Sequence, residues 1–209
     1  MKKTKDRILD TALELFNSQG LSKTTIRSIA NEMGISHGNL NYYYKKREEI
    51  IEVLYFQLVN RIENTMLQIQ HEKTDLSLLL NISSSVITDF YAYRFILIDF
   101  GQIIREHDKI KEHYVFLKQV REQQFLNLLN LLIENNVVRS EKLPNEYQNL
   151  FKRVHILGYF WIPSIDVLNR KITKKDVNKY SEMMSQLIFP YLTEKGVEQY
   201  LLIVNDGKE

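Results

Sequence analysis

The chain has 209 residues, 44% hydrophobic and 26% charged, with seven Gly, three Pro, no Cys and a formal net charge of +2. That length is enough to bury a sizeable core, and the absence of Cys excludes disulfide scaffolds, thiolate metal sites and cysteine nucleophiles. Gly and Pro make up about 5% of the residues against roughly 12% on average, which favours long helices over a turn-rich β-sandwich or barrel.

The first 45 residues predict three short helices. The apolar stripe of the first consists of Ile8, Leu9, Ala12, Leu15 and Phe16, which fall on one helical face. Gly20 follows that stripe, where a helix commonly ends on a residue without a Cβ. Thr24 and Thr25 supply a hydroxyl to cap a second helix that stops at Gly34, and Ser36 is suited to cap a third. The pattern is therefore helix, helix, tight turn, helix.

The rest of the chain predicts longer helices and no strand. The expected ranges are 46–71, 76–105, 114–135, a helix from Pro144 towards 169, and 174–192 followed by a short tail helix. Each range carries apolar residues at helical spacing. The predicted fold class is therefore all-α, with a small N-terminal three-helix domain and a larger helical domain.

Charge and hydropathy indicate the kind of partner and the cellular location that we expect for the protein. Residues 1–50 contain nine Lys or Arg and six Asp or Glu, a net +3, whereas residues 51–209 have a net −1. A basic end on a neutral body is compatible with nucleic-acid binding. The start has no apolar signal-peptide core, and no run approaches 18 uncharged apolar residues. We therefore expect a cytoplasmic protein with no membrane partner.

Two short helices joined through the glycine turn at Gly34 predict a helix-turn-helix, whose second helix enters the DNA major groove. The residues that sharpen this prediction are Ala12-Leu-Glu-Leu-Phe16, Gly20, Thr24-Thr25, Ile29-Ala30, Gly34-Ile-Ser36, Gly38-Asn-Leu40, Tyr43-Tyr44 and Arg47-Glu48. This run resembles the DNA-binding domain of the tetracycline-repressor-like (TetR/AcrR) family over residues 6–52. The sequence departs from the family pattern at Asn41, Tyr44 and Arg47, where the family usually has Tyr, Phe and Lys.

The resemblance implies a helix-turn-helix DNA-binding domain over residues 1–48 and a helical effector-binding and dimerisation domain over residues 49–209. It also implies a homodimer that binds double-stranded operator DNA of palindromic sequence, acting as a repressor that a small-molecule effector releases. Two alternatives are a DNA-binding architectural protein without an effector and a small helical enzyme. No catalytic cluster, cofactor motif or zinc-ligand spacing such as HExxH occurs, so we expect neither an enzyme nor a cofactor or metal site.

The expected DNA contacts lie between residues 25 and 47. Thr25 and Arg27 begin the second helix, where a hydroxyl, a backbone N–H and a cation suit a phosphate. His37, Asn39 and Asn41 are the polar positions best suited to base edges. The complete predicted set is Thr25, Arg27, Ser36, His37, Gly38, Asn39, Asn41, Tyr42, Tyr43, Lys45, Lys46 and Arg47.

The larger domain offers a candidate effector pocket. Asp99 lies in the apolar run Phe95–Ile104, where a buried carboxylate needs a partner. Arg94, Gln102, Arg105 or His155 are candidates for that partner, and an internal ion pair is the alternative to a place on a cavity wall. The predicted pocket residues are Tyr91, Phe95, Asp99, Ile103, Phe125, His155 and Trp161.

Two apolar segments, 154–167 and 180–189, are the candidates for the dimer interface. By the resemblance, these helices meet their twins in a four-helix interface; the alternative is that they close the core of the monomer. The predicted interface residues are Tyr159, Ile162, Ile165, Met184, Leu187 and Ile188.

Overall fold

The computed structural model describes residues 3–69, 75–168 and 171–206. In these residues the regular structure is helical, with an isolated antiparallel bridge between Val138 and Leu192. The all-α prediction is confirmed. None of the described helices has both the length and the apolar character of a membrane span.

The chain divides into two compact units, one of Met1–Arg61 with Ala92–His113 and the other of Ile62–Tyr91 with Tyr114–Glu209. These positions differ from the predicted domains 1–48 and 49–209, which stay a prediction. The family resemblance placed a boundary at the end of the three short helices, whereas the compact unit also takes in the start of the next helix and a segment that is remote in sequence.

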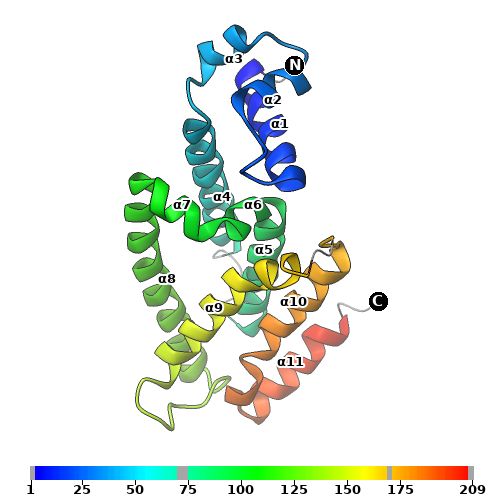
Figure 1. The fold of residues 1–209 in the computed structure, drawn as a ribbon. Helices are drawn as coiled ribbons and strands as arrows, with labels where there is room; N and C mark the ends of the chain where they lie inside the picture. The colour runs from blue at the N-terminus through cyan, green and yellow to red at the C-terminus, as the bar shows by residue number, and fades with distance from the viewer. Residues whose placement is uncertain (1–2, 70–74, 169–170, 207–209) are drawn as a thin grey trace. The chain divides into compact units, whose positions relative to one another are not determined.

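The first unit begins with three helices, α1 (Thr4–Gln19), α2 (Ile26–Glu32) and α3 (His37–Tyr43), which we call the head (Figure 1). Their shared core is formed by Ile8, Ala12, Phe16, Ile29, Ala30 and Leu40, each at most 1% exposed. The stripe predicted from the sequence therefore faces inward. Helix α4 (Arg47–Ile69) follows and buries Ile50 and Leu54.

The first unit is completed by α6 (Arg94–Ile98), α7 (Phe100–Glu106) and the start of α8 (Asp108–Glu134). The prediction of one continuous helix over 76–105 is wrong, because the chain breaks at Tyr93 and again at Asp99. Phe95, which follows the first break, is fully buried and stacks on Phe16 with ring centroids 4.9 Å apart. Packing against the head, rather than a local helix breaker, accompanies the change of direction.

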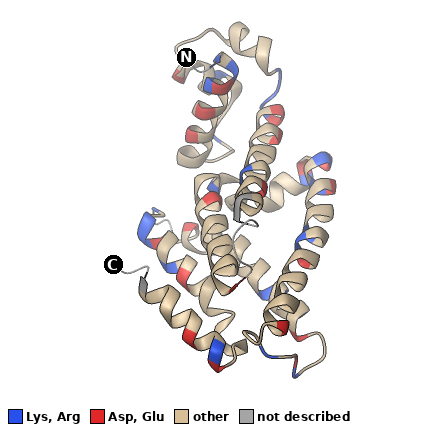
Figure 2. Cartoon of the chain, turned by 180° about the vertical axis from the view of Figure 1, so that it is seen from behind, with Lys and Arg blue, Asp and Glu red and all other residues tan. Residues whose placement is uncertain are grey.

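The second unit contains α5 (Leu76–Ala92), most of α8, α9 (Glu146–Asp166), α10 (Lys174–Gln186), the 3-10 turn η1 (Phe189–Tyr191) and α11 (Glu194–Asp206). The predicted helix over 174–192 ends at Gln186, and α11 is the predicted tail helix. The core of the unit includes Leu76, Leu80, Leu129, Leu132, Val137, Leu150, Ile188 and Tyr200. Both acidic and basic residues are scattered along the helices of the chain (Figure 2).

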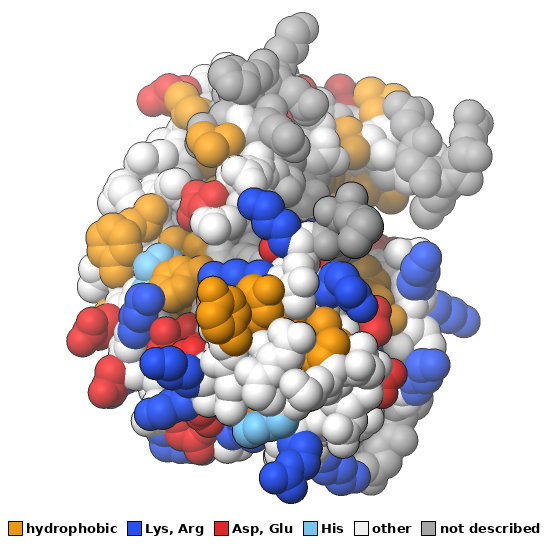
Figure 3. Space-filling model, turned by 90° about the horizontal axis from the view of Figure 1, so that it is seen from above, with side chains coloured by type: hydrophobic (Ala, Val, Ile, Leu, Met, Phe, Trp, Pro, Cys, Tyr) orange, Lys and Arg blue, Asp and Glu red, His pale blue; other side chains and the backbone are white. Residues whose placement is uncertain are grey.

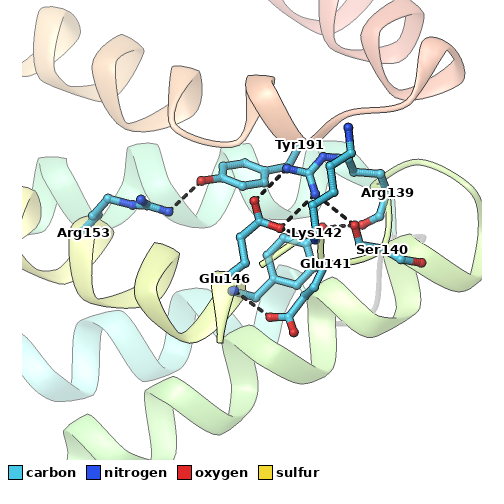
Figure 4. A network of polar contacts seen from close by, with 8 residues as sticks. Arg139, Ser140, Glu141, Lys142, Glu146, Arg153 and Tyr191 are labelled. Carbon is cyan, nitrogen blue, oxygen red and sulfur yellow. Dashed lines mark hydrogen bonds and ion pairs between the residues drawn. The ribbon is translucent and has the colours of Figure 1, made fainter. Parts of the chain in front are cut away.

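A polar network fixes the connection between α8 and α9 (Figure 4). Arg139 donates two hydrogen bonds to Glu146, of 2.9 and 2.8 Å, and its guanidinium lies 5.1 Å from the centre of the Tyr191 ring. These hydrogen bonds and the N–H of Lys142 lower the pKa of Glu146 to about 2. Arg153 donates to the Tyr191 hydroxyl at 2.6 Å. The network thus joins the loop, α9 and η1.

Candidate DNA-binding surface

The start of α2 is closed by a reciprocal cap between Thr25 and Ser28. The Thr25 hydroxyl accepts from the Ser28 N–H at 3.1 Å, and the Ser28 hydroxyl accepts from the Thr25 N–H at 2.8 Å. Of the predicted pair Thr24 and Thr25, Thr25 is therefore the cap. The sequence prediction missed Ser28, whose spacing of three residues is the signal of a capping box. The Thr25 hydroxyl keeps its own proton for an outside acceptor such as a phosphate. Thr25 and Arg27 are both exposed.

The turn before α3 depends on Gly34. Gly34 has φ +66°, the left-handed region that favours glycine, and the next N–H, of Ile35, donates to the Ala30 carbonyl at 3.0 Å. Ser36 then caps α3 by accepting from the Asn39 N–H at 3.1 Å, as predicted. The glycine turn and the serine cap together set the direction in which α3 leaves α2.

The outward face of α3 carries His37, Gly38, Asn39 and Tyr42, all exposed, with Tyr42 at 84%. Leu40 on the opposite face is fully buried. A Cβ added at Gly38 would meet nothing nearer than the Ser36 hydroxyl at 4.0 Å. Packing inside the protein therefore does not require glycine at this position.

Asn41 and Tyr43 lie at the edge of this face and are half-buried. The Asn41 side-chain nitrogen is 3.5 Å from His37 Nδ1, and its Oδ1 is buried with no hydrogen-bond partner. The Tyr43 ring packs edge-on against Tyr42, with centroids 5.2 Å apart. The two side chains therefore pack against their neighbours on α3, while His37, Asn39 and Tyr42 project from it.

The three basic residues after α3 differ in their surroundings. Lys45 and Lys46 are exposed, and the Lys45 backbone N–H donates to Glu49 at 2.9 Å. Arg47 turns inward instead: its Nη1 donates to the Leu21 carbonyl at 2.8 Å, and its Nη2 lies 3.5 Å from Glu48. Figure 3 shows Lys and Arg side chains interspersed with hydrophobic ones on one face of the molecule. Lys45 and Lys46 are thus better placed than Arg47 for a phosphate contact.

Comparison with known proteins assigns the family. Residues 8–54 match the bacterial regulatory proteins of the tetR family, and residues 57–200 match the TetR bacterial transcriptional repressors, the latter covering more than half of the chain. The chain belongs to the TetR family. TetR-family regulators bind operator DNA and function as dimers, and they are not enzymes.

Individual proteins are also similar to this TetR-family chain. It is 26% identical over 134 residues to the uncharacterized HTH-type transcriptional regulator YerO of Bacillus subtilis (strain 168), covering 62% of this chain and 46% of YerO. The chain thus spans about half the length of this curated relative. A TetR-family regulator from Marinobacter aquaeolei VT8 has the same fold, with TM-score 0.86, 20% identity and 98% of each chain covered. The ketosteroid regulator KstR2 of Mycobacterium tuberculosis gives TM-score 0.72 at 16% identity, covering 93% and 97%.

The predicted pocket residues fall in both compact units. Phe95, Asp99 and Ile103 belong to the first unit, where Phe95 and Ile103 are buried and Asp99 is the half-buried residue between α6 and α7. Two of the candidate partners of Asp99 have other contacts: Gln102 donates to Glu106 at 2.9 Å, and His155 pairs with the Tyr114 hydroxyl at 2.8 Å.

The other pocket candidates lie in the second unit. Phe125 and His155 share an aromatic cluster, since both pack against Phe151, with ring centroids 5.7 and 5.8 Å away. Trp161 is 1% exposed, packs against Tyr180 with the ring planes tilted by 31°, and has an indole N–H with no hydrogen-bond partner. Tyr91 is half-buried at the end of α5. In the second unit the predicted residues therefore fall in an aromatic cluster, at a buried tryptophan and at the end of α5.

Most of the predicted dimer residues are buried within the second unit. Ile162, Ile165, Met184 and Ile188 are each at most 8% exposed, and Tyr159 and Leu187 are half-buried. Their exposed neighbours on α9 and α10 are Ile156, Phe160 and Met183, at 65%, 62% and 38%. Helices α9 and α10 are therefore apolar on a buried face and on an exposed face. The sequence alone did not distinguish the buried face from the exposed one.

Proposed function

We propose that this protein is a sequence-specific transcriptional repressor that binds a palindromic operator as a homodimer and is released by a small-molecule effector. The observation that supports this most directly is the exposed face of α3. Its start is fixed by the Gly34 turn and the Ser36 cap, and its outward residues have no role in the core. A rigid helix with free polar side chains is what major-groove reading requires.

The side chains divide into two roles. His37 and Asn39 are exposed on α3 and suit base edges, because an amide pairs bidentately with adenine and an imidazole donates to a guanine acceptor. The Thr25 hydroxyl and the exposed Arg27, Lys45 and Lys46 suit phosphates, which position the protein without reading sequence. Gly38 keeps the backbone of α3 close to the groove.

Dimerisation follows from the same reasoning. A palindromic operator needs two copies of α3 related by a two-fold axis. Ile156 and Phe160 are four residues apart on α9 and are both more than 60% exposed, so they lie on the same helix face. Neighbouring apolar side chains of this kind mark an interaction site. We therefore assign them, rather than their buried neighbours, to the contact between copies.

The aromatic cluster supports effector binding. Burial, with a smaller effect of Lys118, lowers the pKa of His155 to about 4, so the imidazole is neutral near pH 7. The cluster thus combines aromatic surface with one neutral polar pair, His155 and Tyr114, as small-molecule sites usually do. An effector that prefers one conformation of the protein shifts it by the difference in its affinities for the two.

A mobility-shift titration of the DNA next to the protein's own gene tests the proposal. We expect specific binding that weakens steeply with salt. Asn39→Ala should relax the preference at one operator position by about 1–3 kcal/mol, whereas Lys46→Ala should weaken all sequences equally and lower the salt slope by about one. Binding with no preference over random DNA contradicts the proposal, and an equal loss across operator variants removes Asn39 as a base reader.

A further inference from the structure

His37 and Asn41 lie one turn apart on α3, the proposed recognition helix, and their side chains contact each other. Residues four apart on a helix are neighbours on its surface, and the Asn41 side-chain nitrogen Nδ2 lies 3.5 Å from His37 Nδ1. His37 is exposed, whereas Asn41 is half-buried. The partly buried amide therefore holds one ring nitrogen, while the imidazole as a whole stays accessible to a partner.

The oxygen of the Asn41 side chain is turned into the protein. This Oδ1 is buried and has no hydrogen-bond partner among the residues that the structure describes. An asparagine pairs with adenine by presenting its oxygen and its nitrogen together, and a buried oxygen cannot take part in such a pair. Any effect of Asn41 on base reading therefore passes through the side chain that its nitrogen contacts, which is His37.

The contact determines which nitrogen of His37 carries the proton. An amide nitrogen only donates, so His37 Nδ1 accepts from Asn41 and keeps its lone pair. In a neutral imidazole one nitrogen carries a proton and the other accepts. The proton is therefore on Nε2, and the nitrogen that remains for an outside partner is a donor.

The direction of this hydrogen bond decides between bases. In the major groove guanine presents acceptors at N7 and O6, whereas cytosine presents the N4 amino group, a donor. An imidazole with its proton on Nε2 pairs with guanine and is rejected by cytosine. The opposite tautomer, with its proton on Nδ1, presents a lone pair at Nε2 and favours cytosine. The preference at this base pair therefore depends on the tautomer.

We propose that Asn41 is a positioning residue for base reading, which holds His37 as the Nε2–H tautomer so that His37 selects guanine. Asn41 orients the imidazole from within α3, and the imidazole makes the contact with the base. This inference rests on the proposed operator binding and on the role of His37 as a base reader. It adds the residue that fixes how His37 reads.

The ring nitrogens of His37 test the first step. Long-range 1H–15N spectra of the full chain, recorded at about pH 8, above the ordinary titration range of histidine, distinguish a protonated ring nitrogen from one with a lone pair. We expect the proton on Nε2 in the wild-type chain. In Asn41→Asp we expect a proton on Nδ1, because a carboxylate only accepts. A wild-type chain with the proton on Nδ1, or identical spectra for the two chains, overturns the inference.

Competition binding tests the second step. The DNA is a duplex that the wild-type chain selects from a random pool, and the base pair read by His37 is the one whose preference His37→Ala abolishes. We expect guanine there. Asn41→Leu should lower the preference for guanine over cytosine about fivefold, on the scale of one net hydrogen bond, and leave the other positions unchanged. Asn31→Leu, at an exposed asparagine of α2, is the matched control and should keep every preference.

The outcomes separate the inference from the proposed function. A merely structural Asn41 would lower the melting temperature and the affinity for all duplexes when replaced, but would keep the guanine preference, and that result overturns the inference. Selection of cytosine by His37, or a His37→Ala chain that keeps every base preference, overturns it as well while leaving DNA binding intact. A wild-type chain that selects no duplex from the pool contradicts the proposed function and the inference together.

Discussion

At the scale of single residues, local rules account for the starts of α2 and α3. Thr25 and Ser36 are where short-range capping preferences place them, and both make the expected hydrogen bonds. Asn17 carries no such signal, because its partners Ala92 and Phe95 lie 75 and 78 positions away. Capping within three residues is readable from sequence, whereas a cap supplied by another helix is not.

The lowered pKa of His155 predicts that the folded chain loses stability in mild acid. Its pKa is lowered from 6.5 to about 4 in the folded chain, so between these values the unfolded chain binds a proton that the folded chain does not. Stability present above pH 6.5 is therefore lost as the pH falls towards 4. We expect the melting temperature to drop over this window, and His155→Phe to flatten the drop.

Two comparisons check the assignment to His155. His37→Ala, at an exposed histidine of α3, should keep the wild-type profile. The pKa of Glu146 is lowered from 4.5 to about 2, so its contribution to stability is lost only as the pH falls below about 4.5. This range is more acidic than that of His155. Identical profiles for wild type and His155→Phe would rule out His155 as the cause.

At the scale of elements, the sequence predicted the number and order of the head helices and the existence of the long ones. It predicted one helix where α5, α6 and α7 stand, because the run from Leu76 to Arg105 has helical periodicity and neither Gly nor Pro beside Tyr93. At the break, Phe95 stacks on Phe16, and Asn17 bonds to Ala92 and Phe95; these contacts are tertiary structure. The apolar pattern of the run from Leu76 to Arg105 is the same with or without the break.

Helix α11 packs closely against the backbone at Val137, and Gly196 lies at the point of contact. A Cβ at this position would lie 2.1 Å from the Val137 carbonyl oxygen, which is itself held by the Thr193 N–H at 3.0 Å. Gly196→Ala should therefore lower the free energy of unfolding by about 1–3 kcal/mol in a urea titration. Gly158→Ala, where the nearest atoms are 3.8 Å away, should be neutral or stabilising by up to about 1 kcal/mol. Equal effects of the two substitutions would refute this account of the packing.

At the scale of the whole molecule, the exposed side of α9 predicts where copies meet. Phe160→Glu puts a charge on a side chain that is 62% exposed and should weaken self-association about 30-fold or more if it is central to the contact. Leu143→Glu, at an equally exposed leucine of the α8–α9 connection, is the control and should leave association unchanged. Sedimentation measures both, and a Phe160→Glu chain that stays dimeric at low concentration would move the interface elsewhere.

The dimer residues illustrate what periodicity cannot decide. Ile162 and Phe160 are both apolar and two positions apart, yet one is fully buried and the other exposed. A helix that packs on the core with one side and on a partner with another is apolar on both, so the pattern locates the helix but not the face. The family resemblance pointed to the helices; burial separates their sides.

The inward turn of Arg47 has a practical consequence for redesign. Its guanidinium joins the first turn of α4 to the Leu21 carbonyl, and Gly34 sets the turn on the other side of the recognition helix. Both supports lie outside residues 36–44. On the proposed function, that short stretch is an exchangeable cassette: grafting a different set of outward side chains onto it, with the buried Leu40 and Tyr44 and the Ser36 cap kept, would alter the DNA sequence that is read without rebuilding the frame that holds it.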